Sequence, residues 1–156
     1  MPDLTQGKML LSVRVVDPTS GRGAYGSFRV DTGDDVALVD PAILAAIGAS
    51  LTPTGTVGIV GVDGQPINAP SYLLDLDLGP DGYLPGVTLV AMPLGGLGYS
   101  GLIGVNVLKR GLLMLDGPDG EWQFTVGPPK SASVAWLPWT AVGAGLGLLG
   151  AAVFWK

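Results

Sequence analysis

Short apolar runs, each ended by a Gly- or Pro-rich turn, make up most of residues 8–127. The chain contains 26 Gly and 13 Pro, and most of the runs alternate with polar residues or are rich in β-branched ones. This pattern is typical of short strands joined by tight turns. We predict strands over residues 8–17, 24–30, 56–62, 65–69, 72–78, 86–92, 112–116 and 121–126.

Two further segments of this region have helical character but are short. Residues 41–47 hold only two helical turns, and residues 105–110 follow a glycine and form a second short helix. Many short strands with Gly and Pro turns favour a sheet that closes on itself. We therefore predict an all-β fold class, a small closed barrel with one or two short helices, formed by a single domain over residues 1–127.

Residues 134–155 are 22 uncharged, mostly apolar residues. As a helix they would span about 33 Å, close to the ~30 Å of a bilayer's hydrocarbon core. Trp136 and Trp139 lie at one end and Trp155 at the other, as in interfacial aromatic belts. We predict a C-terminal transmembrane helix over residues 134–156 after a linker at 128–133, and the alternative is a buried core helix of a soluble protein.

The predicted membrane segment also bears on location and assembly. No secretory leader opens the chain, so we expect a single-pass C-terminal anchor with residues 1–127 in the cytoplasm. Gly143, Gly147 and Ala151 recur every four residues, which permits close approach of two helices. Such spacing also arises by chance in a segment rich in Gly and Ala.

Composition excludes several kinds of chemistry. The chain has no His and no Cys, so histidine-dependent triads, thiolate nucleophiles and thiolate zinc sites are absent. Residues 1–127 carry all 13 acids against six bases, a net charge of −7, so we expect no nucleic-acid partner. The acids Asp116, Asp119 and Glu121 fit a hairpin turn better than a Ca²⁺ site, and we predict no metal and no cofactor.

One set of motifs points to hydrolytic chemistry. The predicted strand at 24–30 runs directly into Asp31-Thr32-Gly33. A Gly-rich hairpin follows at 56–66, and Leu102-Ile103-Gly104 precedes the second short helix. Asp-Thr-Gly alone is an ordinary turn sequence. The order and spacing of the three motifs together make the segment a candidate site.

In this order of motifs, residues 8–127 resemble the retropepsin-like (clan AA) single-domain aspartic proteases. The resemblance implies an acid-protease-like barrel and a homodimer, because each subunit supplies one catalytic aspartate. Asp31 of each of two subunits would share one proton, since like charges about 3 Å apart do not both ionise readily. One carboxylate would activate a water while the other protonates the carbonyl of a peptide or protein substrate.

The resemblance also assigns roles to other residues. Thr32 would hydrogen-bond across the dimer interface, and Gly33 would let its N–H approach the carboxylate. Leu102, Ile103 and Gly104 would pack beneath the catalytic loop. The hairpin would close over substrate as a flap. Its substrate-binding residues are Gly58, Val60, Gly61 and Val62.

Asp34 and Asp35 depart from the small residue that usually follows Asp-Thr-Gly in this family. A carboxylate beside the dyad raises its proton affinity unless it points into water. The two acids are therefore solvent-facing turn residues, tune the pH optimum, or indicate lost activity. The alternative functions are a catalytically inactive module that dimerises or binds extended peptides at a membrane, and a β-rich structural protein with a membrane tail.

Overall fold

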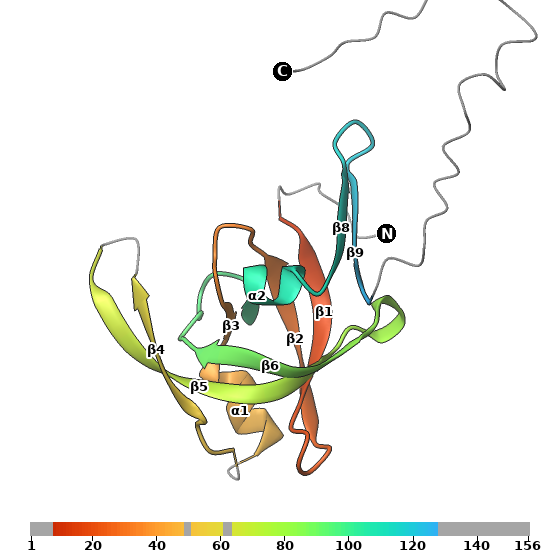
Figure 1. The fold of residues 1–156 in the computed structure, drawn as a ribbon. Coiled ribbons are helices and arrows are strands. Elements are labelled where there is room, and N and C mark those ends of the chain that lie inside the picture. The colour runs from red at the N-terminus through yellow and green to blue at the C-terminus, as the bar shows by residue number, and fades with distance from the viewer. Residues whose placement is uncertain (1–7, 49–50, 61–63, 128–156) are drawn as a thin grey trace, which may run out of the picture.

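Nine strands and two short α-helices follow one another in residues 8–48, 51–60 and 64–127, the part of the chain that the computed structural model describes (Figure 1). The strands are β1 (Leu10–Val16), β2 (Gly23–Val30), β3 (Ala37–Val39), β4 (Gly55–Val60), β5 (Pro66–Asp77), β6 (Tyr83–Ala91), β7 (Gly101–Ile103), β8 (Gly111–Asp116) and β9 (Glu121–Val126). The helices are α1 (Pro41–Ile47) and α2 (Val105–Leu108), with a 3₁₀ turn, η1 (Gly79–Asp81), between β5 and β6.

Six of the strands close into a barrel. The larger sheet has the order β1-β2-β7-β3-β6-β5-β4, and an additional pairing of β1 with β5 joins its first strand to its sixth. The closing pairs run from Arg14 opposite Asp77 to Val16 opposite Asp75. The predicted closed β-barrel is therefore confirmed, and of the predicted one or two short helices the structure has two.

The barrel interior is filled by alternate residues of its strands. In β1, Leu11, Val13 and Val15 are buried while Ser12 is exposed, as expected of a strand with one face on the core. Gly101 is required where β7 passes β2, because a Cβ there would overlap the ring of the fully buried Phe28. Close packing of large side chains thus sets the position of the short central strand.

The region predicted as two strands at 65–69 and 72–78 is a single strand, β5, so that prediction is wrong. Pro70 suggested a break, because proline cannot donate to a sheet ladder. In the structure Pro70 lies just beyond the last pair between β5 and β6, Ser71 with Val90. The first half of β5 extends past the barrel and pairs with β4 to form the predicted hairpin.

A separate two-stranded sheet, β8–β9, follows α2 and stands away from the barrel (Figure 1). The buried side chains of Trp122 and Phe124 attach it to the barrel core. The predicted linker at 128–133 and transmembrane helix at 134–156 lie outside the described residues. Among the residues that are described, no helix has both the length and the apolar character needed to cross a bilayer.

Candidate active site

Asp31 lies at the point where β2 leaves the barrel. Strand β7 pairs with β2 in parallel and with β3 antiparallel, so it lies between these two strands. The segment from Asp31 to Val36, here called the Asp31 loop, therefore has to cross the carboxyl end of β7. The Asp31 N–H donates to the Ile103 carbonyl at 3.0 Å and extends the β2–β7 pairing by one residue.

The Asp31 carboxylate is oriented by its own loop. The Gly33 N–H donates to Asp31 Oδ1 at 3.0 Å. A Cβ on Gly33 would lie 3.3 Å from the same oxygen, which is closer than an ordinary van der Waals contact. Asp31 is half-buried, whereas Thr32 and Gly33 are exposed. The tip of the loop is thus open to a partner or a ligand while the carboxylate is held from one side.

The Asp31 loop rests directly on Gly104 and the start of α2. A Cβ on Gly104 would lie 2.5 Å from the carbonyl carbon and oxygen of Val36 and 2.8 Å from the Asp34 oxygen. The N–H of Val105 donates to the Asp34 carbonyl at 2.7 Å. Absence of a side chain at position 104 therefore lets the loop lie against the backbone that follows β7.

The predicted supporting residues Leu102, Ile103 and Gly104 are all buried at this place, but they face different ways. Ile103 belongs to the barrel core. Leu102 packs in a second apolar cluster on the other face of the sheet, together with Leu38. Only Ile103 and Gly104 contact the Asp31 loop through their backbones.

Asn106 also holds the loop, although no sequence motif points to this residue. Its Oδ1 accepts from the Ala37 N–H at 2.8 Å and its Nδ2 donates to the Thr88 carbonyl at 2.9 Å. Its own N–H donates to the Asp35 carbonyl at 3.0 Å. One side chain thus joins α2, the start of β3 and β6. The sequence offered one clue, an Asn within a short helix. Asn is disfavoured inside helices unless its side-chain amide makes specific hydrogen bonds.

Asp34 and Asp35 differ in their surroundings. Asp35 is exposed, as expected of a solvent-facing turn residue, whereas Asp34 is half-buried. Burial raises the pKa of Asp34 above its ordinary value, and the nearby negative charges of Asp31 and, to a smaller extent, Asp35 raise it further, while the Arg29 guanidinium opposes them. The Asp34 carboxyl is therefore electrostatically coupled to Asp31.

The β4–β5 hairpin covers an apolar cluster next to the Asp31 loop. The buried members of this outer cluster are Leu38, Ala69, Val90, Leu94 and Leu102. Val57 and Ile59 of β4 pack against it, together with Val36 of the Asp31 loop itself. The cluster therefore connects the hairpin with the strands that carry the loop.

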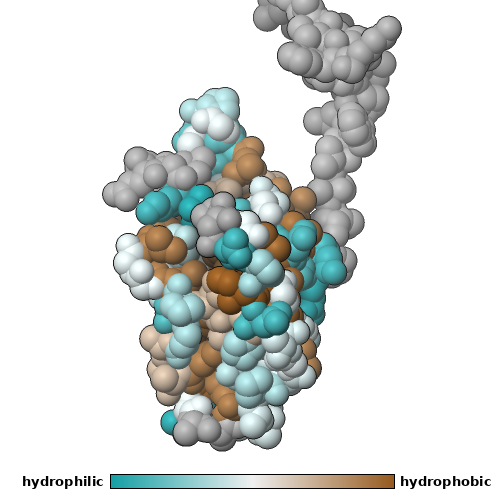
Figure 2. Space-filling model, turned by 90° about the vertical axis from the view of Figure 1, so that its left-hand side faces the viewer, coloured by the Kyte–Doolittle hydropathy of each residue, from teal (hydrophilic) through white to brown (hydrophobic). Residues whose placement is uncertain are grey.

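The structure places two of the four predicted substrate-binding residues, Gly58 and Val60, on the hairpin but not against the outer cluster. Gly58 and Val60 are exposed, alternating along β4 with the inward-facing Val57 and Ile59. Gly61 and Val62 lie outside the described residues. Viewed from the side of β4, apolar and hydrophilic surface are interspersed (Figure 2). Val60, with 68% of its side chain accessible, is among the exposed apolar residues of the chain.

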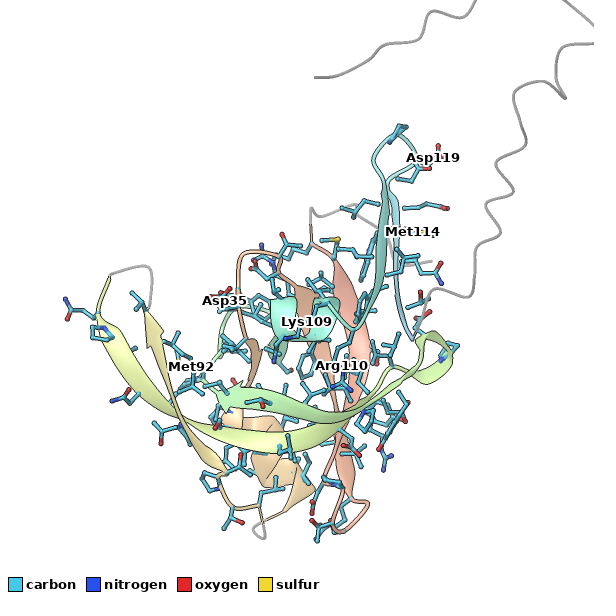
Figure 3. The ribbon with its side chains drawn as sticks, viewed as in Figure 1. Asp35, Met92, Lys109, Arg110, Met114 and Asp119 are labelled. Carbon is cyan, nitrogen blue, oxygen red and sulfur yellow. The ribbon has the colours of Figure 1, made fainter. Side chains whose placement is uncertain are left out.

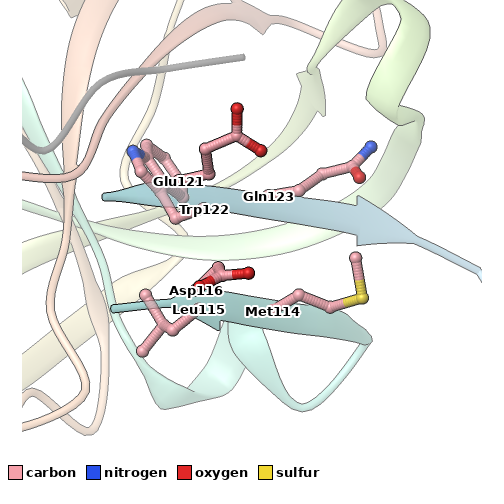
Figure 4. Close-up of a pocket in the computed structure, with 6 residues that line it drawn as sticks. All are labelled: Met114, Leu115, Asp116, Glu121, Trp122 and Gln123. Atoms are coloured by element: carbon pink, nitrogen blue, oxygen red, sulfur yellow. The ribbon is translucent and has the colours of Figure 1, made fainter. Parts of the chain in front are cut away.

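A separate pocket of about 260 Å³ lies on the β8–β9 hairpin (Figure 4). Met114, Leu115 and Trp122 supply its apolar walls, and Asp116 and Glu121 lie opposite one another in the two strands. None of these residues belongs to the Asp31 loop or to β7. Over the described ranges, no three or more acidic side chains are grouped so as to hold a metal ion.

Comparison with protein-family models finds no match for this chain, and comparison with curated proteins finds none either.

Proposed function

We propose that the chain is a homodimeric, retropepsin-like aspartic endopeptidase in which Asp31 of each subunit activates the attacking water. The observation that carries the proposal is the placement of Asp31: its backbone is tied to Ile103 across the end of β7, and its Oδ1 accepts the Gly33 N–H. A carboxylate held this way has a defined orientation toward the exposed tip of its loop. Orientation of the reacting group is a main source of catalytic rate.

A pair of such carboxylates performs the chemistry without His, Cys or a metal. Two Asp31 side chains that meet at a two-fold axis share one proton, because two carboxyl groups about 3 Å apart do not readily ionise at the same time. The ionised carboxylate takes a proton from the water, and the protonated one donates to the carbonyl oxygen of the peptide. The hydroxyl oxygen adds to the carbonyl carbon and forms a diol. As the diol collapses, the carboxyl group that took the proton of the water passes it to the amide nitrogen, and the other carboxylate takes a proton from a diol hydroxyl. The C–N bond then breaks, an amine and a carboxylic acid leave, and the pair again holds one proton.

Dimer formation through the Asp31 loop fits the exposure of its tip. Thr32 and Gly33 are exposed in the single subunit, although they directly follow the half-buried Asp31. A symmetric contact places the same surface of each subunit against the other. In the proposed dimer Thr32 lies at this contact and keeps the two loops in register.

The substrate is a peptide or protein segment in extended conformation. The β4–β5 hairpin lies over the outer cluster, and its inward-facing Val57 and Ile59, with Val36 of the loop, offer apolar contacts. Extended peptides add to exposed strands through backbone hydrogen bonds, and side-chain pockets supply the preference. We therefore expect apolar residues to be preferred next to the scissile bond.

Attachment to a membrane by residues 134–156, as a single-pass C-terminal helix, completes the proposal. The uncharged, apolar composition of residues 134–155 and the Trp residues at both ends support it. Residues 1–127 then lie in the cytoplasm, and confinement to one membrane raises the effective concentration of subunits for dimer formation.

A peptide-library digest of the full chain in detergent tests the proposal, with cleavage products identified by mass spectrometry. Asp31→Asn keeps the size and hydrogen-bonding capacity of the side chain but removes the ionisable group, and it should reduce cleavage by about 10³-fold. Asp35→Asn is the matched control, because Asp35 is an exposed acid of the same loop. Cleavage that persists unchanged in Asp31→Asn contradicts the proposal.

A catalytically inactive peptide-binding module is the second candidate, and the position of Asp34 favours it. Its carboxyl is half-buried and feels the negative charge of Asp31, so that a dimer would bring the charges of two Asp34 carboxyls near the pair of Asp31 side chains. Repulsion among them opposes the singly protonated pair that catalysis needs. Saturable binding of library peptides without turnover from pH 3 to 8 (roughly the range over which carboxyl pairs titrate) would favour this module over the enzyme.

A further inference from the structure

Lys109 and Arg110 are the only two consecutive basic residues in the sequence. They follow α2 directly, and Figure 3 shows Lys109 at this helix and Arg110 between it and β6. Both line a shallow, open cavity of about 450 Å³, whose other lining residues are Tyr83, Leu84, Gly111, Val126 and Gly127. We call this cavity the basic pocket, because these two cations are its only charged lining residues.

Arg110 is held in place within the basic pocket. Its Nη2 donates to the Pro85 carbonyl at 2.8 Å, and its own carbonyl accepts the Gly127 N–H at 3.3 Å. A guanidinium has five N–H donors, so the bond to Pro85 leaves others for a ligand. Lys109 is exposed and adds a second positive charge beside it.

The other polar group of the pocket wall does not neutralise these cations. The Tyr83 hydroxyl donates to Asp75 Oδ2, and this hydrogen bond to a carboxylate raises the pKa of Tyr83, so the phenol stays neutral. Tyr83, Leu84 and Val126 therefore contribute mainly apolar surface. A pocket with two cations over apolar walls fits an anion that is attached to an apolar group.

The positive charge of the basic pocket is unusual in this acidic domain. The pocket also lies only a few residues before the predicted membrane segment. Residues 1–127 carry 13 acids and six bases, so two cations at one cavity run against the prevailing charge. Val126 and Gly127 line the pocket, and the predicted membrane segment begins at Val134. Seven residues reach at most about 25 Å when fully extended. The pocket is therefore tethered close to the surface of any bilayer that residues 134–155 enter.

We propose that the basic pocket binds the phosphate-containing headgroup of an anionic membrane phospholipid. Phosphate oxygens accept from the Arg110 guanidinium and the Lys109 ammonium, and the apolar walls contact the glycerol and the first acyl carbons. The β4–β5 hairpin and the end of β9 lie on opposite sides of the barrel (Figure 1), so docking here leaves the hairpin directed away from the tether. This inference rests on the proposed membrane attachment, but not on peptidase activity.

The test uses the full chain in two kinds of nanodisc, one of phosphatidylcholine alone and one that also contains phosphatidylglycerol. Backbone hydrogen exchange of residues 105–114 reports docking, because a bound headgroup suppresses local opening at the pocket. We expect slower exchange in the phosphatidylglycerol discs. Lys109→Gln should weaken docking about fivefold, the effect of one basic residue near an anionic surface.

Lys8→Gln is the matched control, since Lys8 is also an exposed lysine and the change in net charge is the same. It should retain the protection seen with the unaltered chain. Arg110→Gln is a second variant, and phosphatidylcholine discs with added inorganic phosphate separate a lipid headgroup from a free anion. Protection by free phosphate alone, or an equal loss in Lys8→Gln and Lys109→Gln, would overturn the proposal.

The outcomes also separate this proposal from the one on which it rests. A chain that co-elutes with both nanodiscs but exchanges equally in them is attached to the membrane without a headgroup site. A chain that co-elutes with neither contradicts the attachment and the headgroup site together. Cleavage of peptides in detergent should be unchanged by Lys109→Gln, so peptidase activity neither supports nor masks the result.

Discussion

The N–H of Gly33 donates a hydrogen bond to Asp31 Oδ1 at 3.0 Å, within a loop that crosses the end of β7. This hydrogen bond links the first and last residues of the Asp31-Thr32-Gly33 motif and indicates a separate role for each of them. In the proposed enzyme the Asp31 carboxylate is the reactive group, and Gly33, which has no side chain, lets the backbone N–H orient it.

Gly33→Ala should reduce peptide cleavage about 10- to 100-fold with little loss of stability. The added Cβ would lie 3.3 Å from Asp31 Oδ1, so the carboxylate has to shift by a few tenths of an ångström. Displacements of this kind in a reacting group lower kcat far more than they affect folding. Kinetics and the melting temperature measure the two effects separately. Gly95→Ala is the control, because a Cβ at Gly95 meets nothing within 4 Å, and equal kinetics in the two variants would contradict the prediction.

Gly104→Ala should impair folding as well as activity. Its Cβ would lie 2.5 Å from the Val36 carbonyl, a backbone group that has no rotamer by which to move away. Overpacking of this kind typically costs about 1–3 kcal/mol. Urea denaturation of the described domain within the full chain measures this loss. Gly117→Ala, whose Cβ has open space, should leave the transition unchanged. A Gly104→Ala transition that matches that of Gly117→Ala would show that the Asp31 loop does not rest on Gly104.

Asn106→Ala should destabilise the chain by about 1–3 kcal/mol. The substitution leaves the Ala37 N–H and the Thr88 carbonyl without the partners that Asn106 supplies. It should also lower kcat, because Asn106 positions the Asp31 loop without touching substrate. Denaturant titration and kinetics measure both effects. Asn68→Ala, at an exposed position of β5, is the control for stability. A loss of stability equal in the two variants would argue against the bridging role of Asn106.

Asp34→Asn should make the chain more stable than wild type near neutral pH (about pH 7). The pKa of Asp34 is raised in the folded state, so the folded chain binds this proton more tightly than the unfolded chain does. The favourable contribution of Asp34 to the free energy of unfolding is therefore complete when the pH is below the ordinary pKa of 3.8. It is lost as the pH rises through the raised pKa of the folded state. The stability difference from Asp34→Asn should vanish in acid.

Denaturation midpoints measured across the acidic and neutral range test this pH dependence. Asp35→Asn serves for comparison, because Asp35 is exposed and contributes only the smallest of the causes that raise the pKa of Asp34. Its effect on stability should be smaller across the range. If the gain in stability from Asp34→Asn were the same at every pH, the ionisation of Asp34 would not be the source of that gain.

Local sequence patterns sufficed for the elements that are stabilised locally. Helix α1 spans the predicted residues 41–47, since Pro41 begins it and the Asp40 side chain caps it by accepting the Ala42 N–H at 2.9 Å. The opening hairpin of β1 and β2 and the hairpin of β8 and β9 also lie within about two residues of their predicted bounds. In each case turn residues and alternating burial act over neighbouring positions.

Two strands beside the site, β3 and β7, escaped prediction because their partners are distant in sequence. Strands β3 and β7 have three residues each, all buried, so neither shows an alternating pattern. Their positions depend on pairing with each other across more than half of the barrel sequence. The amide of Asn106 reaches Ala37, which is 69 residues away in the chain. No local rule detects such a contact.

The position of the β4–β5 hairpin was predicted, but which of its residues face inward was not. The predicted hairpin at 56–66 corresponds to β4 and the start of β5, and Gly58, Val60, Gly61 and Val62 stay its predicted substrate-binding residues. The alternation along β4 places Val57 and Ile59 on the inner side, against the outer cluster, and leaves Gly58 and Val60 exposed. Which of two alternating sets faces inward depends on the register with β5, where Val57 lies opposite Ala69 of the outer cluster.

Mixing wild-type and Asp31→Asn chains before detergent exchange tests the central claim most directly. If one active site needs Asp31 from both subunits, the cleavage rate should fall with the square of the wild-type fraction. An equal mixture then retains about a quarter of the activity of an all-wild-type sample at the same total concentration. A rate that falls in proportion to the wild-type fraction, to about a half in the equal mixture, would show that each chain acts alone and would contradict the shared carboxylate pair.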